Sequence, residues 1–250
     1  MESKDLLYRI MKIETLLEDL YDLNVNNKKK CSVCNSDLRL FVPFGVKLRR
    51  NAKCPVCGSM ERHRAFFRLL TKDGFFTNNK KVKLLHFAPE PCFFEQLGVN
   101  ENIDYYPVDF DPDYPGIVRV VDITDIPYHD NEFDFIFCHH VLEHIPDDKT
   151  AMAELYRVLK VNGLAYISVP LNLKLSETLE KDEYNTPELR LKYYNQEDHV
   201  RFYSLDVVDR LETAGFIVTV VKPNKDLSDE ELYRYGLIRN AIFFKCEKKI

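Results

Sequence analysis

Apolar residues recur every three or four positions between Leu6 and Leu20. This period is that of an amphipathic helix, and its polar faces carry acidic residues such as Glu14 and Glu18. Because an acidic face does not suit a membrane surface, we expect the helix to pack against the body of the protein or against a second subunit. The second arrangement would make the protein a homodimer.

The pattern changes after residue 80, where short apolar runs alternate with amphipathic stretches. Seven runs indicate strands, at residues 82–87, 103–109, 117–121, 133–138, 164–169, 216–221 and 241–246. Three stretches have the period of a helix, at residues 92–97, 149–159 and 204–214. This alternation predicts an α/β fold with a Rossmann-like, mostly parallel sheet of seven strands and helices on both faces. We expect the last two helices to stop near Gly163 and Gly215.

We divide the chain into three parts. Residues 1–27 are expected to form the N-terminal helix, residues 28–70 a cysteine module with the helix that follows it, and residues 80–250 the α/β domain. A polar, tyrosine-rich insertion at about residues 172–200 separates the fifth predicted strand from the next helix. The sequence has no secretory signal and no apolar run of roughly 18 residues, so we expect a cytoplasmic protein without a membrane segment.

Four of the seven cysteines occur in two Cys-x-x-Cys pairs, Cys31 with Cys34 and Cys54 with Cys57, which 19 residues separate. This spacing lets two tight turns present four thiolates to one Zn²⁺ in tetrahedral geometry. We therefore predict a zinc ribbon whose folding depends on the metal, because its own core is too small. Four cysteine ligands leave no open position, so the zinc would be structural. A redox dithiol is the alternative interpretation.

Basic residues are concentrated around these cysteines. Residues 28–68 hold eleven Lys or Arg against two acids, a formal charge of +9, while the rest of the chain sums to −14. Such a surface could bind RNA or a phosphorylated substrate. Docking of the basic module onto the acidic remainder of the same protein explains the charge equally well.

The segment from residue 122 to residue 163 carries a family signal. It begins Asp-Ile-Thr-Asp-Ile-Pro-Tyr-His-Asp-Asn-Glu-Phe-Asp-Phe-Ile-Phe-Cys-His-His-Val-Leu-Glu-His-Ile-Pro-Asp-Asp and continues from residue 154 as Glu-Leu-Tyr-Arg-Val-Leu-Lys-Val-Asn-Gly. This sequence resembles the class I S-adenosylmethionine-dependent methyltransferases, in particular the type-11-like group. Together with the stretches 85–90 and 198–201, the cysteine module resembles a bacterial subgroup that has an N-terminal four-cysteine zinc ribbon.

The resemblance implies which residues hold the cofactor. Asp109 ends the second predicted strand, where a carboxylate can accept both ribose hydroxyls, with Phe110 beside the adenine. Asp122 and Ile123 follow the third strand, where an acid meets the adenine amino group and the next backbone amide meets a ring nitrogen. Turn formation is the alternative role for both aspartates, and Asp111 competes with Asp109 for the ribose.

The first loop of the domain departs from the pattern of the family. Many relatives have an acid and a glycine-rich loop after the first strand, but the corresponding positions here are His86, Phe87, Ala88, Pro89 and Glu90. A loop without glycine cannot cradle a dinucleotide phosphate, whereas a cofactor without phosphates requires only a close turn. We assign His86, Phe87, Ala88 and Glu90 to the cofactor site on this basis.

The connection between the second and third predicted strands is short. Only seven residues separate Asp109 from Ile117, whereas a parallel crossover normally requires a dozen or more. Either the usual helix is reduced to a turn, or the strands end elsewhere.

Histidines follow the fourth predicted strand, at the mouth where cofactor and acceptor would meet. A hydroxyl acceptor benefits from a general base, and histidine suits this role near neutral pH. The candidates are His139, which we also expect to contact the cofactor, His140, and His199 in the insertion, a segment that commonly covers the acceptor in this fold. Arg201 is expected to bind an anionic acceptor, with a solvent-facing role as an equal alternative. A structural role is favoured for His144.

We therefore predict an enzyme that transfers a methyl group from S-adenosylmethionine to a small hydroxylated acceptor, such as a sugar or nucleotide-sugar. RNA methylation through the basic ribbon is the second hypothesis. A metal hydrolase built on His140, Glu143 and His144 is a rival, but the spacing misses the pattern that places two ligands on one helical face. A module of this fold that only binds a partner is the remaining alternative.

Overall fold

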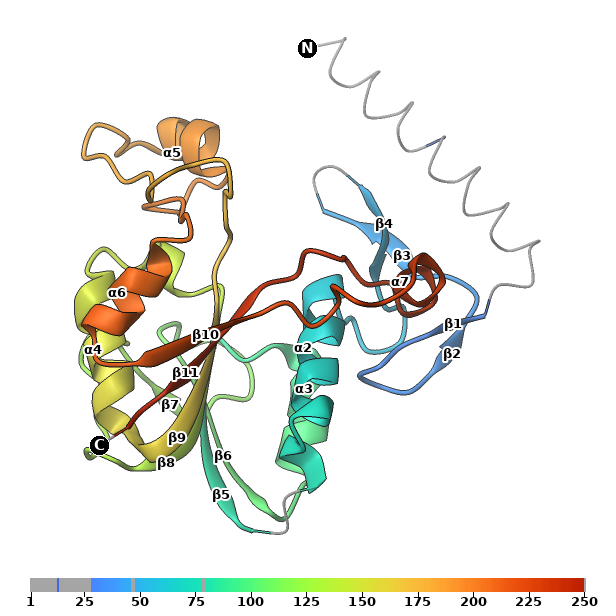
Figure 1. The fold of residues 1–250 in the computed structure, drawn as a ribbon, viewed down its shortest axis with the longest axis horizontal. Coiled ribbons are helices and arrows are strands. Elements are labelled where there is room, and N and C mark those ends of the chain that lie inside the picture. The colour runs from blue at the N-terminus through green and yellow to red at the C-terminus, as the bar shows by residue number, and fades with distance from the viewer. Residues whose placement is uncertain (1–12, 14–27, 46–47, 78–79, 250) are drawn as a thin grey trace. The chain divides into compact units, whose positions relative to one another are not determined.

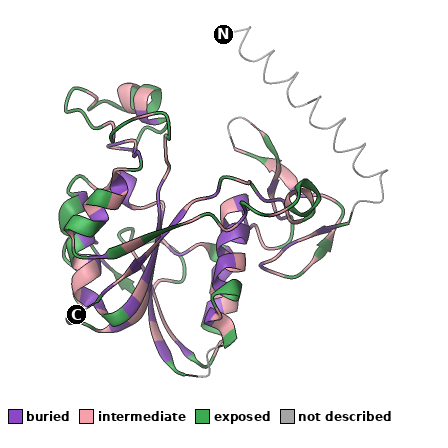
Figure 2. Cartoon of the chain, viewed as in Figure 1, coloured by how far each residue is buried: buried purple, intermediate pink, exposed green. Residues whose placement is uncertain are grey.

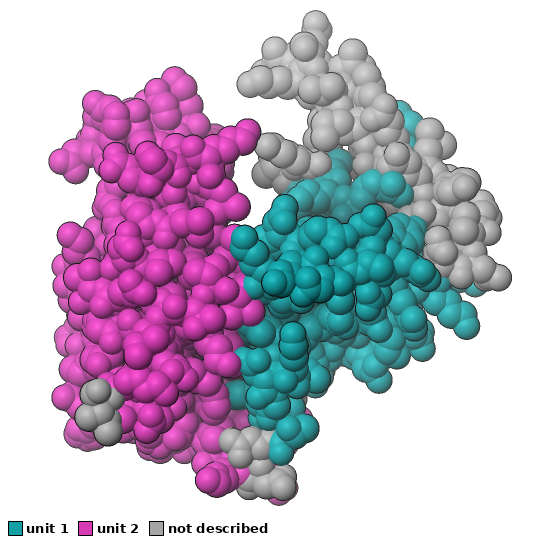
Figure 3. All heavy atoms as spheres, in the orientation of Figure 1, with its two compact units in different colours: residues 1–78, 91–96, 222–241 teal, residues 79–90, 97–221, 242–250 magenta. Residues whose placement is uncertain are grey.

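The computed structural model describes residue 13 and residues 28–45, 48–77 and 80–249 (Figure 1). The helix predicted between residues 6 and 20, and with it the predicted dimer contact, lies outside the described residues apart from Ile13. The chain forms two compact units that alternate along the sequence (Figure 3). We call them the sheet unit, which comprises Asn79–Glu90, Leu97–Val221 and Ile242–Ile250, and the cysteine unit, which comprises Met1–Asn78, Pro91–Gln96 and Lys222–Ala241.

The sheet unit contains a sheet of seven strands. In chain order these are β5 (Val82–Phe87), β6 (Ile103–Asp109), β7 (Arg119–Val120), β8 (Phe133–His139), β9 (Leu159–Ser168), β10 (Ile217–Val221) and β11 (Phe243–Glu247). Their order across the sheet is β10-β11-β9-β8-β5-β6-β7, and of these seven strands β11 runs antiparallel to both of its neighbours. Because β5 pairs in parallel with β6 on one side and with β8 on the other, the strand order reverses at β5. The predicted Rossmann-like, mostly parallel sheet is confirmed.

Helices and turns connect these strands: α3 (Pro91–Gly98), the short 3-10 turn η2 (Leu142–His144), α4 (Asp148–Val158), α5 (Pro187–Tyr194) and α6 (Val207–Thr213). α4 contacts β9 and α6, and α6 contacts β10. None of the helices in the described ranges combines the length and apolar character needed to cross a bilayer.

The central strands are buried along most of their length (Figure 2). Five of the six positions of β5 are buried, as expected for the interior of a parallel sheet. Leu85 of β5 and Ile136 of β8 belong to one apolar core with Leu155 of α4 and Leu211 of α6. This core fixes the strands and leaves their carboxyl ends to carry polar segments.

Gly163 does not end a helix as predicted. α4 stops at Val158 and β9 follows directly, so Gly163 lies inside a strand. A Cβ atom there would lie 2.8 Å from the Lys160 carbonyl oxygen and 3.0 Å from that of Asp134 in β8. The glycine is required for the close approach of two strands whose pairing is irregular at this point. Gly215, by contrast, follows α6 with a φ of +108°, as expected where a helix ends.

The connection from β6 to β7 is a turn. Within residues 110–118, all of which are described, the Tyr114 N–H donates to the Asp111 carbonyl oxygen at 3.1 Å. β7 itself covers Arg119–Val120 instead of the predicted residues 117–121. The short connection between the second and third predicted strands therefore has two causes. The usual helix is reduced to a turn, and the third strand is shorter than predicted.

The cysteine unit is built from two short antiparallel hairpins and several helices. β1 (Lys29–Lys30) pairs with β2 (Asp37–Leu38), and β3 (Val42–Phe44) pairs with β4 (Arg49–Lys53). α2 (Glu61–Lys72) and η1 (Phe75–Thr77) follow. The excursion Lys222–Ala241, which connects β10 to β11, adds α7 (Asp229–Tyr235) to the unit, and α7 contacts β1.

A buried arginine joins the parts of the cysteine unit. Arg64 of α2 is fully buried, and its guanidinium lies 3.9 Å from the ring centre of Phe41. The guanidinium donates hydrogen bonds of 2.6 to 3.0 Å to the carbonyl oxygens of Asn51, Ala52, Ser59, Tyr235 and Gly236. The planar fork of five N–H donors suits arginine to this role, which lysine could not fill. α2, β4 and the end of α7 are thereby held around one side chain.

Several of the basic residues around the cysteines are engaged inside their own unit. Lys29 is buried and donates to the Tyr233 carbonyl oxygen at 3.2 Å. Arg49 pairs with Glu61 at 3.1 Å. Part of the +9 charge of residues 28–68 is therefore bonded within the unit, and RNA binding by this module stays a prediction.

We expect the substitution Arg64→Gln to lower the free energy of unfolding by about 3 kcal/mol or more, because several buried carbonyl oxygens would lose their donor at about 1 to 3 kcal/mol each. Guanidinium unfolding followed by far-ultraviolet circular dichroism measures the change. Arg39→Gln is the matched control, since Arg39 is exposed, and it should stay within about 0.5 kcal/mol of the parent. Equal losses for the two variants would contradict the role of Arg64.

Candidate functional site

The carboxyl ends of the central strands border a cavity of about 500 Å³. This is the edge, at a reversal of strand order, where open α/β sheets bind ligands, and the volume lies in the range of small-molecule sites. Six of the predicted cofactor residues line the cavity: Phe87, Ala88, Asp109, Phe110, Asp122 and Ile123. The candidate base His140 lines it as well.

Two aspartates each use one carboxylate oxygen to shape a turn beside the cavity. Asp109 Oδ1 accepts from the Asp111 N–H at 2.8 Å, and Asp122 Oδ1 accepts from the N–H and the hydroxyl of Thr124 at 2.8 and 2.7 Å. The second oxygen of each, Oδ2, accepts no hydrogen bond from the described residues. Turn formation and ligand binding are therefore compatible, because each carboxylate has one oxygen for each role.

Ala88 takes the left-handed backbone conformation that a glycine would favour. Its φ is +46°, and its N–H donates to the Val108 carbonyl oxygen at 3.0 Å. The chain thus turns sharply after β5 although the loop lacks glycine. A strained residue in this position is typical of a site where the backbone approaches a ligand closely.

His86 and Glu90 lie behind this loop and do not line the cavity. His86 is fully buried, with Nδ1 at 3.0 Å from the Tyr105 hydroxyl and Nε2 at 3.0 Å from Glu90 Oε2. The pair joins the end of β5 to the residue that precedes α3. His86 and Glu90 hold the loop that forms the wall, and their predicted direct contact with the cofactor stays a prediction.

The two histidines after β8 have different surroundings. His139 is 5% exposed, its Nδ1 lies 2.9 Å from Ser168 Oγ in β9, and it does not line the cavity. His140 lines the cavity with a left-handed φ of +55°, and its Nδ1 lies 3.3 Å from Glu143 Oε1. Of the two, His140 is the one in position to meet a bound molecule.

Arg201 is buried and is bonded mainly to backbone carbonyl oxygens. Its guanidinium donates to the carbonyl oxygens of Leu142, Ile145 and Pro146 and to Glu180 Oε1. The side chain is 1% exposed and lines a smaller polar cavity of the insertion, so its predicted contact with an anionic acceptor stays a prediction. Arg201 fixes the segment after β8 that forms one wall of the cavity.

Further charged groups extend this network. Asp148 Oδ2 accepts from the Tyr203 hydroxyl at 2.6 Å and from Arg210 at 2.8 Å. Burial raises the pKa of Glu180, but hydrogen bonds and charge from Arg201 and Arg210 outweigh it, so the pKa lies below its usual value. The carboxylate therefore stays ionised and keeps both arginines in place.

The insertion forms a second, polar cavity of about 270 Å³. Its walls include Lys181, Tyr184 and Arg190, and Pro146 lines both this cavity and the larger one. Tyr184 also stacks on Tyr193 with ring centres 3.9 Å apart. A polar compartment therefore adjoins the cavity at the sheet edge.

His199 lies at the end of the insertion and is 2% exposed. Its Nδ1 lies 3.1 Å from the Tyr194 carbonyl oxygen, and its ring packs edge-on against His144 with centres 4.8 Å apart. Burial lowers the pKa of His199 below its usual value, so the ring is neutral near pH 7. His199 does not line the larger cavity, but its neighbour His144 does.

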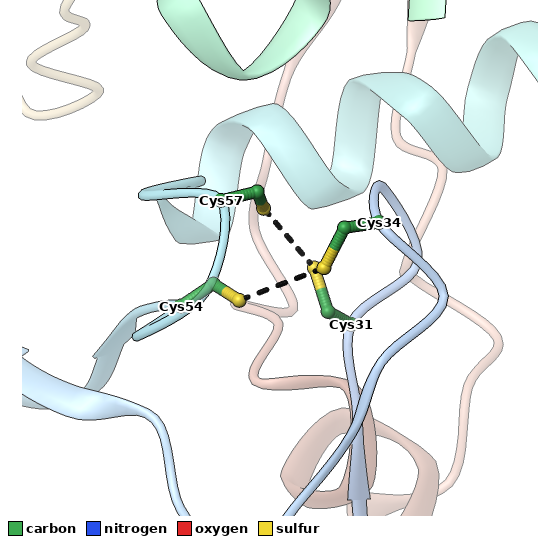
Figure 4. Close-up of side chains that lie close together, drawn as sticks. All are labelled: Cys31, Cys34, Cys54 and Cys57. Atoms are coloured by element: carbon green, nitrogen blue, oxygen red, sulfur yellow. Dashed lines mark hydrogen bonds between the residues drawn. The ribbon is translucent and has the colours of Figure 1, made fainter. Parts of the chain in front are cut away.

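The four predicted zinc ligands converge in the cysteine unit (Figure 4). Their sulfur atoms lie within 4.8 Å of one another, with Cys31 Sγ at 3.7 Å from Cys57 Sγ and Cys34 Sγ at 3.9 Å from Cys54 Sγ. Tetrahedral zinc with bonds of about 2.3 Å separates its sulfurs by about 3.8 Å. The hydrogen bond between the Cys31 and Cys57 thiols lowers the pKa of Cys31 and raises the pKa of Cys57, so Cys31 is the first of the pair to become a thiolate. The donor set and spacing therefore fit one zinc ion.

Six residues of the larger cavity were not predicted from the sequence or were given no binding role: Val121, Thr124, Val141, His144, Ile145 and Pro146. Four of these belong to the single run that follows β8. These residues could have been predicted from their position after a strand of a parallel sheet, because the segments that follow such strands form the walls of the cavity.

Residues 99–167 match the model of a methyltransferase domain family. A candidate methyltransferase of Bacillus subtilis (strain 168), YrhH, is 40% identical over 48 residues, which are 19% of this chain and 27% of YrhH. The demethylmenaquinone methyltransferase of Staphylococcus carnosus (strain TM300) is 46% identical over 44 residues, 18% of each chain. The chain thus spans less than a third of the length of these curated relatives.

Solved structures support the fold. The 4+2 cyclase SpnF has a TM-score of 0.54 at 14% identity, and the match covers 94% of this chain and 97% of SpnF. The CurJ carbon methyltransferase has a TM-score of 0.50 at 10% identity, over 74% of this chain and 54% of CurJ. At such identities the likeness concerns the fold alone, and function has to be argued from the site.

We expect the substitution Ala88→Gly to raise the free energy of unfolding by about 1 kcal/mol, because glycine tolerates the left-handed conformation without a Cβ penalty. Urea unfolding followed by tyrosine fluorescence measures it. Ala153→Gly in α4, at an exposed helical position, should act in the opposite direction by about 1 kcal/mol. A loss of stability in both variants would show that Ala88 is not strained.

Proposed function

We propose that this protein is an S-adenosylmethionine-dependent methyltransferase whose cofactor occupies the cavity at the carboxyl edge of the sheet. The observation that supports this most directly is the pair Asp109 and Asp122, each with one carboxylate oxygen available beside the cavity. Asp109 would accept the ribose hydroxyls, and Asp122 with the Ile123 amide would hold the adenine. The match of residues 99–167 to a methyltransferase domain covers the strands and turns that carry these groups.

The residues around the cavity divide the remaining tasks. Bound S-adenosylmethionine supplies a methyl group whose transfer forms a carbon–oxygen bond to the acceptor, breaks the carbon–sulfur bond, and leaves a thioether and a proton. His140 would take the proton from the acceptor hydroxyl, a role usually worth about 10² to 10⁴ in rate. Ala88 and Phe87 would exclude water from beneath the cofactor tail. His139, His86 and Glu90 would act by positioning these groups, and Arg201 would fix the segment after β8.

A small, hydroxylated acceptor is the class that the neighbouring compartment suits best. The cavity of about 270 Å³ in the insertion is lined by lysine, arginine, acids and tyrosine, and it adjoins the cofactor cavity at Pro146. Polar side chains of both signs suit sugar-like molecules with hydroxyl groups. Transfer of labelled methyl groups into a fractionated cell extract tests the class, since label in small polar molecules supports it and label in nuclease-sensitive material would favour RNA.

We further propose that the four cysteines bind one structural zinc ion. The hydroxyl of Ser59 lies 3.3 Å from Cys31 Sγ and 3.2 Å from Cys57 Sγ, where it can support the thiolates. Because all four protein ligands are sulfurs, the ion would hold the two hairpins together and leave no position for a substrate.

The cofactor proposal predicts a loss of affinity in Asp109→Asn. Charge-assisted hydrogen bonds contribute about 1.5 to 3 kcal/mol, so we expect calorimetric titration with S-adenosylmethionine to show roughly 10- to 100-fold weaker binding. Asp111→Asn, in the same turn but outside the cavity, should bind like the parent protein. Absence of binding to the parent protein would overturn the proposal, and loss in Asp111→Asn alone would transfer the ribose role to Asp111.

The zinc proposal predicts one zinc ion per chain by elemental analysis of the purified protein. Cys34→Ser should lower the zinc content below half an ion and unfold the cysteine unit, since metal binding supplies much of the folding energy of such modules. Cys246→Ala, which removes a buried thiol from β11, should keep the full zinc content. Equal zinc content in Cys34→Ser and the parent protein would refute the assignment.

A further inference from the structure

Three potential metal ligands gather beside the cofactor cavity, apart from the cysteines. Glu143 and His144 come from η2, and His199 comes from the end of the insertion. Each offers one ligand atom, and these three atoms lie within 4.8 Å of one another. His144 also lines the larger cavity, so the cluster borders the space assigned to the cofactor.

The carboxylate of Glu143 is buried without the usual compensation. The residue is 1% exposed, and neither carboxylate oxygen accepts a hydrogen bond from the described residues. Its nearest cationic candidate is the ring of His140 at 3.3 Å, which carries charge only when protonated, and no lysine or arginine of the described ranges pairs with it. Because a buried carboxylate is costly unless it is paired, hydrogen-bonded or bound to metal, this geometry suits a cation-binding site.

Both histidines are oriented as metal ligands usually are. His199 Nδ1 faces the Tyr194 carbonyl oxygen at 3.1 Å, which places the ring proton there and leaves Nε2 as a lone pair that is buried and without a hydrogen bond. His144 Nδ1 lies 3.2 Å from Asp198 Oδ2, so in the neutral ring the proton lies on Nδ1 and Nε2 carries a lone pair. A second partner that fixes the tautomer in this way is the common arrangement around metal-bound histidine.

We propose that Glu143, His144 and His199 bind one divalent transition-metal ion at the acceptor side of the cofactor cavity. Two imidazoles and one carboxylate form a set that suits iron, cobalt, nickel, manganese or zinc and leaves coordination positions open. This inference rests on the proposed methyl transfer for its role, in which the ion holds the acceptor's hydroxyl oxygen and lowers its pKa. The ion does not alter which bonds form and break during methyl transfer, and the hydroxyl proton still passes to His140.

The site gives the acceptor a more specific chemical class. An oxygen that binds the ion directly must reach the cluster from the larger cavity, which His144 lines and which shares Pro146 with the polar cavity. A hydroxyl with a second oxygen on the neighbouring carbon could occupy two open positions at once. We therefore infer an acceptor with vicinal oxygens, such as a diol of a sugar or of a ribose.

Calorimetric titration of the full, zinc-loaded chain with Co²⁺ tests the site without requiring the acceptor. The parent protein should bind one Co²⁺ per chain while its zinc content, measured before and after, stays constant. Glu143→Gln and His199→Gln should each weaken Co²⁺ binding at least 10-fold, and Asp198→Asn should weaken it by about 10-fold through the orientation of His144. His129→Gln, at an exposed histidine outside the cluster, is the matched control and should bind like the parent protein.

Two results would overturn the site: absence of saturable Co²⁺ binding by the parent protein, or equal affinity in the parent protein and both ligand variants. Circular dichroism verifies that the variants fold, and having two ligand variants keeps the test valid if one of them does not. A parallel titration with S-adenosylmethionine separates the two proposals. Cofactor binding without Co²⁺ binding rejects the metal site alone, whereas Co²⁺ binding without cofactor binding supports the metal site and rejects the methyltransferase.

Discussion

Parallel pairing of β5 with β6 and β8 is the constraint on which the candidate site depends. Because parallel strands end on the same edge, the segments that follow them must meet there, whatever their separation along the chain. The turn at Ala88, the carboxylates of Asp109 and Asp122, and the ring of His140 become neighbours of one cavity for this reason. The apolar core holds the strands, and their parallel pairing brings the starts of these segments to one edge.

Irregular segments require a different kind of support, which two buried arginines supply. Arg64 gathers five carbonyl oxygens in the cysteine unit, and Arg201 gathers three carbonyl oxygens and Glu180 beside the cavity. Carbonyl groups that no helix or strand satisfies would be costly when buried, and a guanidinium can satisfy several of them at once. Both arginines therefore replace regular secondary structure as the source of local order.

Much of the sheet could be predicted from apolar runs, and β5 and β6 have the predicted bounds. The pattern failed where tertiary contact overrides it, as at Gly163, whose need for space arises from a neighbouring strand. The cysteine cluster and the acids at the strand ends were predictable because spacing and strand position fix them. The surroundings of Arg201 and His199 were not, because their partners Glu180 and His144 come from other segments that only the fold brings near.

The excursion Lys222–Ala241 has a consequence for how the chain is made. It joins β10 to β11, yet β11 lies between β10 and β9 inside the sheet. During synthesis the sheet therefore stays open until Phe243–Glu247 emerge, and the cysteine unit waits for Tyr235 and Gly236 to reach Arg64. Neither unit corresponds to a continuous stretch of sequence. A chain truncated before residue 222 would therefore lack parts of both units at once.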